Sequence, residues 1–365
     1  MEILSIVRFR LFKTYERRSQ MNKMLNCLVN KVMCTALVAL GAFAAGAELV
    51  KMPILQTFED ENGTVTESVG YKVTGLENGE VAMVYTNHLR TATLRVRASL
   101  ENVQFLVVGG GGGGGAGLAG PGGGGGGVVT GFVYKLEKNV AVDVKVGAGG
   151  KGGQSYLAGG KAGGDSSIVV GKTPYVLAYG GGAGVRYANG GDGGSGSGGG
   201  ADKNNTIEYI GGKVKEAVCA EGVLFAESFG HEGGSNGTSQ YSSGGGGGAM
   251  GVGGDAVDKT AGNGGEGLKM DITGSLITYG SGGGGGSAGT NGIGGTNAGN
   301  GGKNSGTTNK KAGSAKANCG GGGGGGGPSN FNAPNYIGYG GNGGSGIVVL
   351  RYKEPNTSGF KVIVR

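Results

Sequence analysis

Histidine is nearly absent from this sequence, which has only His88 and His231, and tryptophan is absent altogether. A serine or cysteine nucleophile needs a neighbouring general base, and histidine is the usual one. No acid-bearing motif of a glycoside hydrolase stands out among the carboxylates. The sequence therefore predicts a protein that is not an enzyme and that binds no cofactor.

Proline is scarce as well, with 6 residues beside 94 glycines. A collagen triple helix needs glycine at every third position and many prolines, whereas the unbroken glycine runs at 109–115, 122–127 and 320–327 ignore that period. The first run also satisfies the glycine pattern of a dinucleotide site. However, Pro121 and six more glycines follow where that site needs a helix and then an acidic residue. Both the collagen class and the nucleotide-binding class are excluded.

A long hydrophobic run is missing too. The apolar stretch from Val32 to Ala45 has 14 residues, short of the roughly 20 that span a bilayer. It follows a weakly basic stretch and precedes the small residues Ala45, Gly46 and Ala47, a pattern typical of a signal peptide. We therefore expect residues 1–47 to be a signal peptide cleaved after Ala47, with translation starting at Met1 or Met21. A retained anchor is the less favoured alternative, so stable membrane insertion is not expected after cleavage.

Net charge is small once this segment is removed. The chain has 32 basic and 25 acidic residues, of which residues 1–47 hold 7 and 2. A nearly neutral remainder gives no electrostatic reason to expect binding to nucleic acid or to an anionic membrane.

Cysteine is also rare, and Cys27 and Cys34 lie inside the predicted signal peptide. Cys219 and Cys319 remain. Two thiols without neighbouring histidines cannot complete a zinc site, so an exported pair favours a disulfide. The alternative is two free buried thiols.

Short β-branched runs and turn dipeptides predict an all-β fold of antiparallel strands. Residues 48–102 have ordinary glycine content and the turns Asn62-Gly63 and Asn78-Gly79, which indicate a small N-terminal β module. A glycine-rich domain follows over 103–352, and then a C-terminal extension over 353–365. The strands expected in the glycine-rich domain are 105–108, 128–136, 140–146, 167–170, 175–179, 207–210, 223–225, 272–279 and 347–352.

The glycine segments between these strands are either flexible linkers or structure. Ordering glycine costs about 0.5–1 kcal/mol more than ordering alanine, so an ordered run needs dense backbone contacts. A polyglycine II bundle supplies them, because each extended helix has three residues per turn and every N–H can bond a neighbour. One residue in three can face outward at the bundle edge, as Asp192 and Asn342 do in triplets such as Gly-Gly-Asn.

Aspartates follow glycine at Asp165, Asp192 and Asp255, which superficially suggests calcium loops. Such loops need a nonapeptide repeat with aspartate in a fixed register, and these three residues are unevenly spaced. We interpret them as solvated turn residues and expect no metal site.

Four ordered landmarks identify a resemblance: FLVVGGGG from Phe105, the glycine run 122–127 followed by Val128, VKVGAGG from Val144, and GGSGIVVLRY from Gly343. Together they resemble the bacterial and phage glycine-rich domain found in tail-fibre adhesins, over residues 103–352. A similar module occurs in the ectodomains of anaplastic lymphoma kinase and leukocyte tyrosine kinase. The resemblance implies a polyglycine II bundle with β elements, whose exposed loops contact receptors in the adhesins. It implies no kinase activity.

Aromatic residues also occur in polar stretches between glycine runs, outside the expected strands: Tyr187, Tyr241, Phe331, Tyr336 and Tyr339. These are either ordinary loop residues or the anchors of a contact surface. The sequence thus predicts an exported surface protein whose scaffold presents loops for adhesion to a cell-surface glycan or protein receptor. The alternative is a structural component of an envelope or matrix without a specific ligand.

Overall fold

A computed structural model describes most of the chain after residue 53. The described residues are 54–59, 65–66, 71–76, 79–96, 99–155, 158–171, 173–201, 207–221, 223–237, 241–303, 311–328 and 338–353. The expected signal peptide, Phe331, Tyr336 and residues 354–365 of the C-terminal extension lie outside them.

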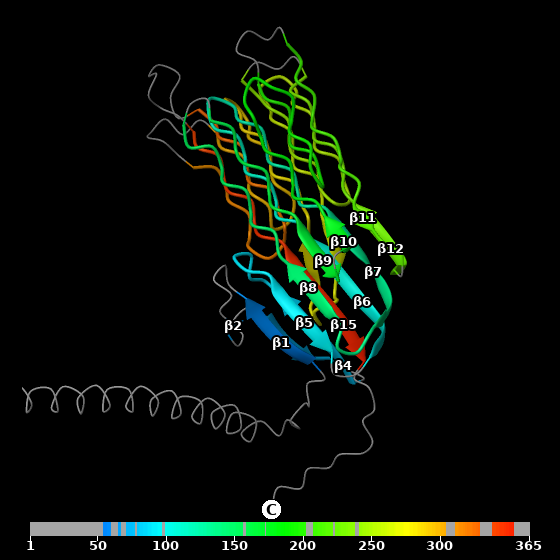
Figure 1. The fold of residues 1–365 in the computed structure, drawn as a ribbon. Coiled ribbons are helices and arrows are strands. Elements are labelled where there is room, and N and C mark those ends of the chain that lie inside the picture. Colours follow the sequence, from blue (N-terminus) through cyan, green and yellow to red (C-terminus); the bar gives the residue numbers. More distant parts are fainter. Residues whose placement is uncertain are drawn as a thin grey trace, which may run out of the picture. The chain divides into compact units, whose positions relative to one another are not determined.

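The described chain consists of β-strands and of glycine segments that connect them (Figure 1). The strands are β1 (Ile54–Glu59), β2 (Val65–Thr66), β3 (Tyr71–Gly75), β4 (Glu80–Tyr85), β5 (Ala92–Val96), β6 (Leu100–Val108), β7 (Val128–Leu136), β8 (Ala141–Lys145), β9 (Ser166–Val170), β10 (Thr173–Ala178), β11 (Val218–Cys219), β12 (Val223–Phe229), β13 (Leu268–Met270), β14 (Ile277–Tyr279) and β15 (Ile347–Lys353).

Two large sheets are formed, with the orders β11-β10-β9-β8-β5-β1-β2 and β12-β7-β6-β15-β4-β3, and β13 pairs with β14 in a separate hairpin. Every pairing between these strands is antiparallel. No α-helix occurs in the part of the chain that the structure describes. The predicted all-β fold class is confirmed.

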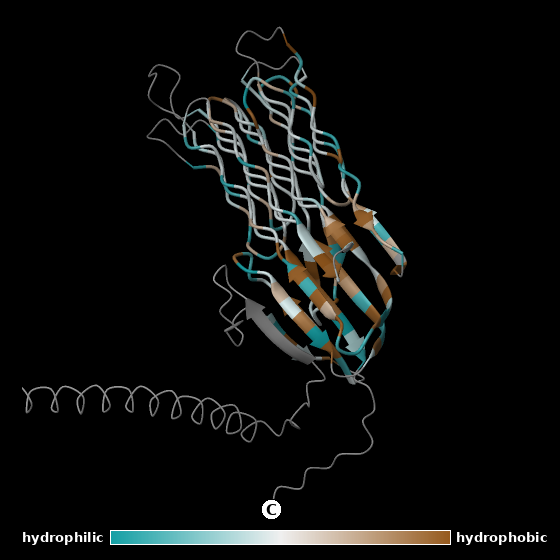
Figure 2. Ribbon diagram, viewed as in Figure 1, coloured by the Kyte–Doolittle hydropathy of each residue, from teal (hydrophilic) through white to brown (hydrophobic). Residues whose placement is uncertain are grey.

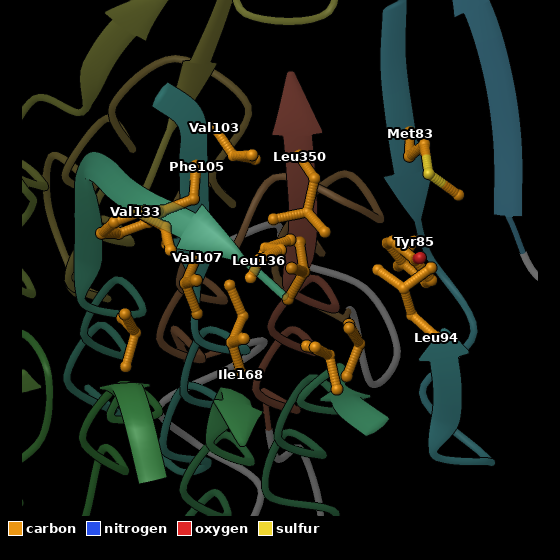
Figure 3. Close-up of a cluster of buried hydrophobic side chains, with 14 of the residues drawn as sticks. Met83, Tyr85, Leu94, Val103, Phe105, Val107, Val133, Leu136, Ile168 and Leu350 are labelled. Carbon is orange, nitrogen blue, oxygen red and sulfur yellow. The ribbon is translucent and has the colours of Figure 1, made fainter. Parts of the chain in front are cut away.

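Side chains from both sheets form one hydrophobic core between them. Phe105 of β6, Leu94 of β5, Ile168 of β9 and Leu350 of β15 are among its buried members (Figure 3). Alternation along each strand produces this core, because successive side chains point to opposite faces of a sheet. Figure 2 shows the hydrophobic residues concentrated in the strands, while the glycine segments are intermediate in hydropathy.

A second hydrophobic cluster lies on the other face of the six-stranded sheet. It contains Leu106 of β6 and Ile347 and Val349 of β15, together with Ile272 and Tyr279 from the β13–β14 hairpin. The hairpin therefore covers the outer face of this sheet. This is why the sequence from 347 to 350 is apolar without interruption: β15 is buried on both faces here.

The predicted separate N-terminal module is not observed. Strand β4 pairs with β15, and β5 pairs with β8, so strands from 48–102 complete both sheets of the glycine-rich domain. Strands β3 and β4, on either side of the turn expected at Asn78-Gly79, do pair antiparallel, and Asn78 itself lies outside the described residues. Gly79 has a φ of 71°, which explains the glycine there.

Two expected strands differ in the structure. Residues 207–210 form no strand and belong to the glycine bundle. In the region 272–279 only β14 is a strand, because a turn at Gly274, with φ 81°, separates it from β13. Both stretches contain apolar residues of the kind found in strands, which is why the sequence predicted strands there.

The glycine segments lie alongside one another in a hydrogen-bonded bundle (Figure 1). In the run 109–115, the N–H groups of residues 109, 112 and 115 donate to carbonyl groups in 121–127. Those of residues 110 and 113 donate to 161–164, and those of 111 and 114 donate to 341–344. The N–H groups of this run thus donate to three neighbouring segments with a three-residue period, which is the period of the polyglycine II geometry expected from the sequence.

Packing in the bundle leaves no room for side chains. A Cβ atom added to Gly112 would lie 1.9 Å from the carbonyl oxygen of Gly182, and one added to Gly323 would lie 2.1 Å from that of Gly341. The contacting atoms are backbone and cannot rotate away. The flexible-linker alternative therefore does not hold for these runs.

Aspartate and asparagine side chains complete the edges of the bundle. Asp165 Oδ1 accepts a hydrogen bond from the N–H of Gly180 at 2.8 Å, and Asp192 Oδ1 accepts one from Lys213 at 2.8 Å. Asp255 Oδ1 is 2.6 Å from the N–H of Ser235. Asp192 and Asp255 are exposed, as expected for solvated residues. Each of the three aspartates also caps a backbone amide of a neighbouring segment, which the sequence analysis did not predict.

Candidate functional site

Connections between glycine segments gather at the end of the bundle remote from the sheets, which we call the distal end (Figure 1). Strand β6 continues into the run 109–115, turns at 117–120 and returns through 122–127 to β7. Strands β8 and β9 are joined in the same way through glycine segments and a turn near residue 155. This topology explains how Tyr187, Tyr241 and Tyr339 come to one end of the bundle.

Tyr187 follows an arginine that sequence analysis missed. The Arg186 guanidinium carbon lies 4.1 Å from the centre of the Tyr187 ring, and Arg186 Nη2 donates a hydrogen bond to the Tyr187 hydroxyl. Arg186 is 6% exposed and its aliphatic part crosses Gly117, where an added Cβ would lie 2.7 Å from Arg186 Cδ. The sequence feature that could have indicated this contact is an adjacent arginine and tyrosine between two glycine runs, because arginine commonly stacks on aromatic rings.

Tyr241 and Tyr339 are both half-buried, and each is fixed through its backbone. The carbonyl oxygen of Tyr241 accepts a hydrogen bond from the N–H of Ala288 at 2.9 Å, and that of Tyr339 accepts one from Ala312 at 2.9 Å. These bonds attach each tyrosine to an adjacent segment of the bundle. The main-chain position of both residues is therefore set by the scaffold.

The turn at 117–120 contacts the three segments that carry Tyr187, Tyr241 and Tyr339. Gly117 contacts the Arg186 side chain and donates its N–H to the carbonyl oxygen of Gly338, which precedes Tyr339. Ser243, two residues after Tyr241, donates its hydroxyl to the carbonyl oxygen of Gly120 at 2.6 Å. The structure thus gathers three of the five predicted aromatic residues around one turn. Phe331 and Tyr336 lie outside the described residues.

Backbone conformation distinguishes two of these tyrosines. Seven non-glycine residues among those described have positive φ, and five of them are asparagine or aspartate. The other two are Tyr187, with φ 54°, and Tyr241, with φ 56°. Asparagine and aspartate tolerate this left-handed region, whereas a bulky aromatic residue is strained there.

The two remaining cysteines do not form the predicted disulfide. Both are free thiols in the structure. Cys219 is exposed on β11, the edge strand of the seven-stranded sheet, and Cys319 is buried beside the β13–β14 hairpin, where its carbonyl oxygen accepts a hydrogen bond from Gly280. The two residues therefore belong to different parts of the fold.

Among the described residues, no three His, Cys, Asp and Glu side chains are grouped so that they could hold a metal ion. No helix long and apolar enough to cross a membrane occurs among them.

Comparison with known families gives one match. A family model described as a glycine-rich domain matches residues 86–353, which is most of the chain. No curated protein matches the sequence.

Proposed function

The chain belongs to the glycine-rich domain family, and from this premise we propose that it is an exported, non-catalytic surface protein that presents the distal end of its bundle for adhesion. The ligand is a cell-surface glycan or protein receptor. The scaffold holds the distal end rigidly through backbone hydrogen bonds, and the turns there supply the variable side chains.

The observation that carries this proposal is the conformation of Tyr187 and Tyr241. A residue held in a sparsely populated backbone region costs about 1–3 kcal/mol, and such strain concentrates at functional sites. Glycine or asparagine would relieve it, and the chain uses both freely elsewhere in the bundle. Retaining tyrosine at two strained positions on one end of the scaffold is what a contact surface would require, because aromatic side chains are the usual binding anchors.

Two observations support the absence of catalysis. His231 Nδ1 lies 3.1 Å from the carbonyl oxygen of Gly248, so this histidine contacts the backbone of the bundle. His88 is exposed in the loop after β4. Neither histidine belongs to the distal end, where the scaffold presents its turns.

The proposal that the protein is exported can be tested by identifying its N-terminal residue after export. We expect the exported protein to begin at Glu48, because small residues precede it and the apolar run is short. Mass spectrometry of protein recovered outside the producing cells would measure this end. Recovery of Met1 or Met21 in a membrane fraction would contradict it.

The binding test replaces the two strained tyrosines without adding strain. Asparagine tolerates positive φ, so the double variant Tyr187→Asn and Tyr241→Asn removes both rings while the backbone keeps its conformation. We expect saturable binding of the unmodified protein on a glycan array or on intact cells, and a loss of at least tenfold, about 1.4 kcal/mol, in the variant. The melting temperature should not fall by more than the loss of the cation–π contact and the hydrogen bond between Arg186 and Tyr187 explains.

A matched control removes an exposed tyrosine elsewhere. Tyr134 is 58% exposed on β7, in the six-stranded sheet, and Tyr134→Ala should leave binding unchanged. Equal binding by the double variant would overturn the adhesive surface. No saturable binding by the unmodified protein would favour the alternative, a structural component of an envelope or matrix.

A further inference from the structure

A pocket of about 810 Å³ opens on the outer face of the six-stranded sheet, away from the distal end. Strands β3 and β4 form one wall through Thr74 and Val84, and β15 contributes Ile347. The β13–β14 hairpin contributes Ile277, and the chain just before the run 320–327 closes the remaining side. We call this the hairpin pocket.

Charged side chains at its rim are mostly basic. Lys72 and Lys316 are exposed, and neither forms a salt bridge with another described residue. Arg351 is engaged, because its Nε donates to Glu80 Oε2 at 2.9 Å. Among the described residues that line the pocket, Asp271 is the one acidic residue. Two unpaired ammonium groups therefore face one carboxylate, which favours an anionic ligand over a cation.

The inner part of the pocket is apolar. Val84 and Ile277 are half-buried, and Ile347 is buried at 4% exposure. Cys319 also lines the pocket, and this residue is 3% exposed. Burial raises the pKa of this thiol, while nearby Lys316 opposes the rise. The neutral thiol thus behaves as part of the apolar surface.

Size and lining together resemble a small-molecule site. Ligand pockets have volumes of about 300–1,000 Å³ and combine apolar walls with a few polar groups that orient the ligand. We propose that the hairpin pocket binds a small amphipathic organic anion, with its apolar part against Val84, Ile277 and Ile347 and its anionic group between Lys72 and Lys316. This site is independent of the adhesive surface proposed above.

The probe for this proposal is 8-anilinonaphthalene-1-sulfonate, which combines aromatic rings with one sulfonate. Fluorescence titration of the full chain should give a saturable site of one probe per molecule. The double variant Lys72→Glu and Lys316→Glu should lower the affinity at least tenfold, because both cations are replaced by repelling charges. Its melting temperature should stay close to that of the unmodified protein, since both side chains are exposed.

The control makes the same change of charge outside the pocket. Lys269 on β13 and Lys353 on β15 are exposed and do not line it, so Lys269→Glu with Lys353→Glu should change the affinity less than twofold. An equal loss in both double variants would show a general effect of protein charge and would overturn the site. Absence of saturable binding would overturn it as well.

A second readout locates the probe. Saturating probe should slow the alkylation of Cys319 by N-ethylmaleimide at least fivefold, measured on the peptide that contains this residue. Alkylation of exposed Cys219 should proceed at an unchanged rate in the same sample. Binding without protection of Cys319 would place the probe elsewhere and would contradict the proposal.

Discussion

The carboxamide oxygen of Asn342 accepts a hydrogen bond from the backbone N–H of Gly152 at 3.0 Å, although the two residues are 190 positions apart in the sequence. Asn342 is half-buried, and its own backbone bonds Ser314 and Ala315 of a third segment. Its side chain supplies the acceptor that a further segment would otherwise provide. The edge of the bundle is therefore closed by side chains as well as by solvent.

Removing this acceptor should destabilise the protein. Asn342→Ala leaves the N–H of Gly152 without its partner, so we expect the free energy of unfolding to fall by about 1 kcal/mol. Asn342→Asp keeps an acceptor oxygen and should lose less. Urea denaturation of the three proteins measures the difference, and equal stability of the alanine variant would refute the capping role.

Side chains in the bundle interior should be far more damaging. Gly112→Ala and Gly323→Ala place a Cβ atom about 2 Å from a backbone carbonyl oxygen, and such overlap should cost at least about 3 kcal/mol or prevent folding. Gly75→Ala is the matched control, because nothing lies within 4 Å of its added Cβ. Thermal melts compare the three variants, and similar melting temperatures would contradict the close packing.

Alkaline pH should destabilise the protein through Tyr279. Burial raises the pKa of this phenol to about 12, above the value of about 10 in an unfolded chain. The neutral phenol therefore makes its full contribution to the free energy of unfolding below pH 10. This contribution is lost as the pH rises from 10 toward 12, because the phenol releases its proton in the unfolded state before it does so in the folded state. The slope in that window should approach 1.4 kcal/mol per pH unit.

The variant Tyr279→Phe isolates this contribution, since the other tyrosines titrate in both proteins. Urea denaturation between pH 9 and 12 should show a steeper loss of stability in the unmodified protein. Parallel pH profiles would mean that Tyr279 ionises as easily in the folded state as in the unfolded chain.

The two free thiols should react at different rates. Cys219 is exposed and Cys319 is buried, so an alkylating reagent should modify Cys219 first and Cys319 much more slowly. Peptide mapping without reduction gives both rates and also detects any disulfide. A linked Cys219–Cys319 peptide from folded protein would contradict the observed separation.

Local sequence predicted the strands best where glycine bounds an apolar run. Expected strand 128–136 coincides with β7 because glycine precedes it and β-branched residues begin it. The strand within residues 272–279 was harder to predict, because the turn at Gly274 divides a run that is apolar enough to form one strand. The pairing of β4 with β15 could not be foreseen, because nothing near residue 80 specifies a partner near residue 350.

The candidate site was predictable in part for the same reason. Polar stretches between glycine runs pointed to Tyr187 and Tyr241, and the topology does bring them to one end of the bundle. The stacking of Arg186 over Tyr187 and the hairpin pocket depend on contacts between distant segments. The edge capping by Asp165 and Asn342 depends on them as well, because each residue bonds an amide of another segment.

Strand β15 lies between β6 and β4, in the interior of the six-stranded sheet. During synthesis, this sheet has a vacant position until residue 353 has left the ribosome. Contacts between residues so far apart in sequence form slowly, because a long loop must close before they contribute. The nascent chain is thus expected to remain unfolded while it is made and to fold only after release, which is the state that a translocation channel accepts.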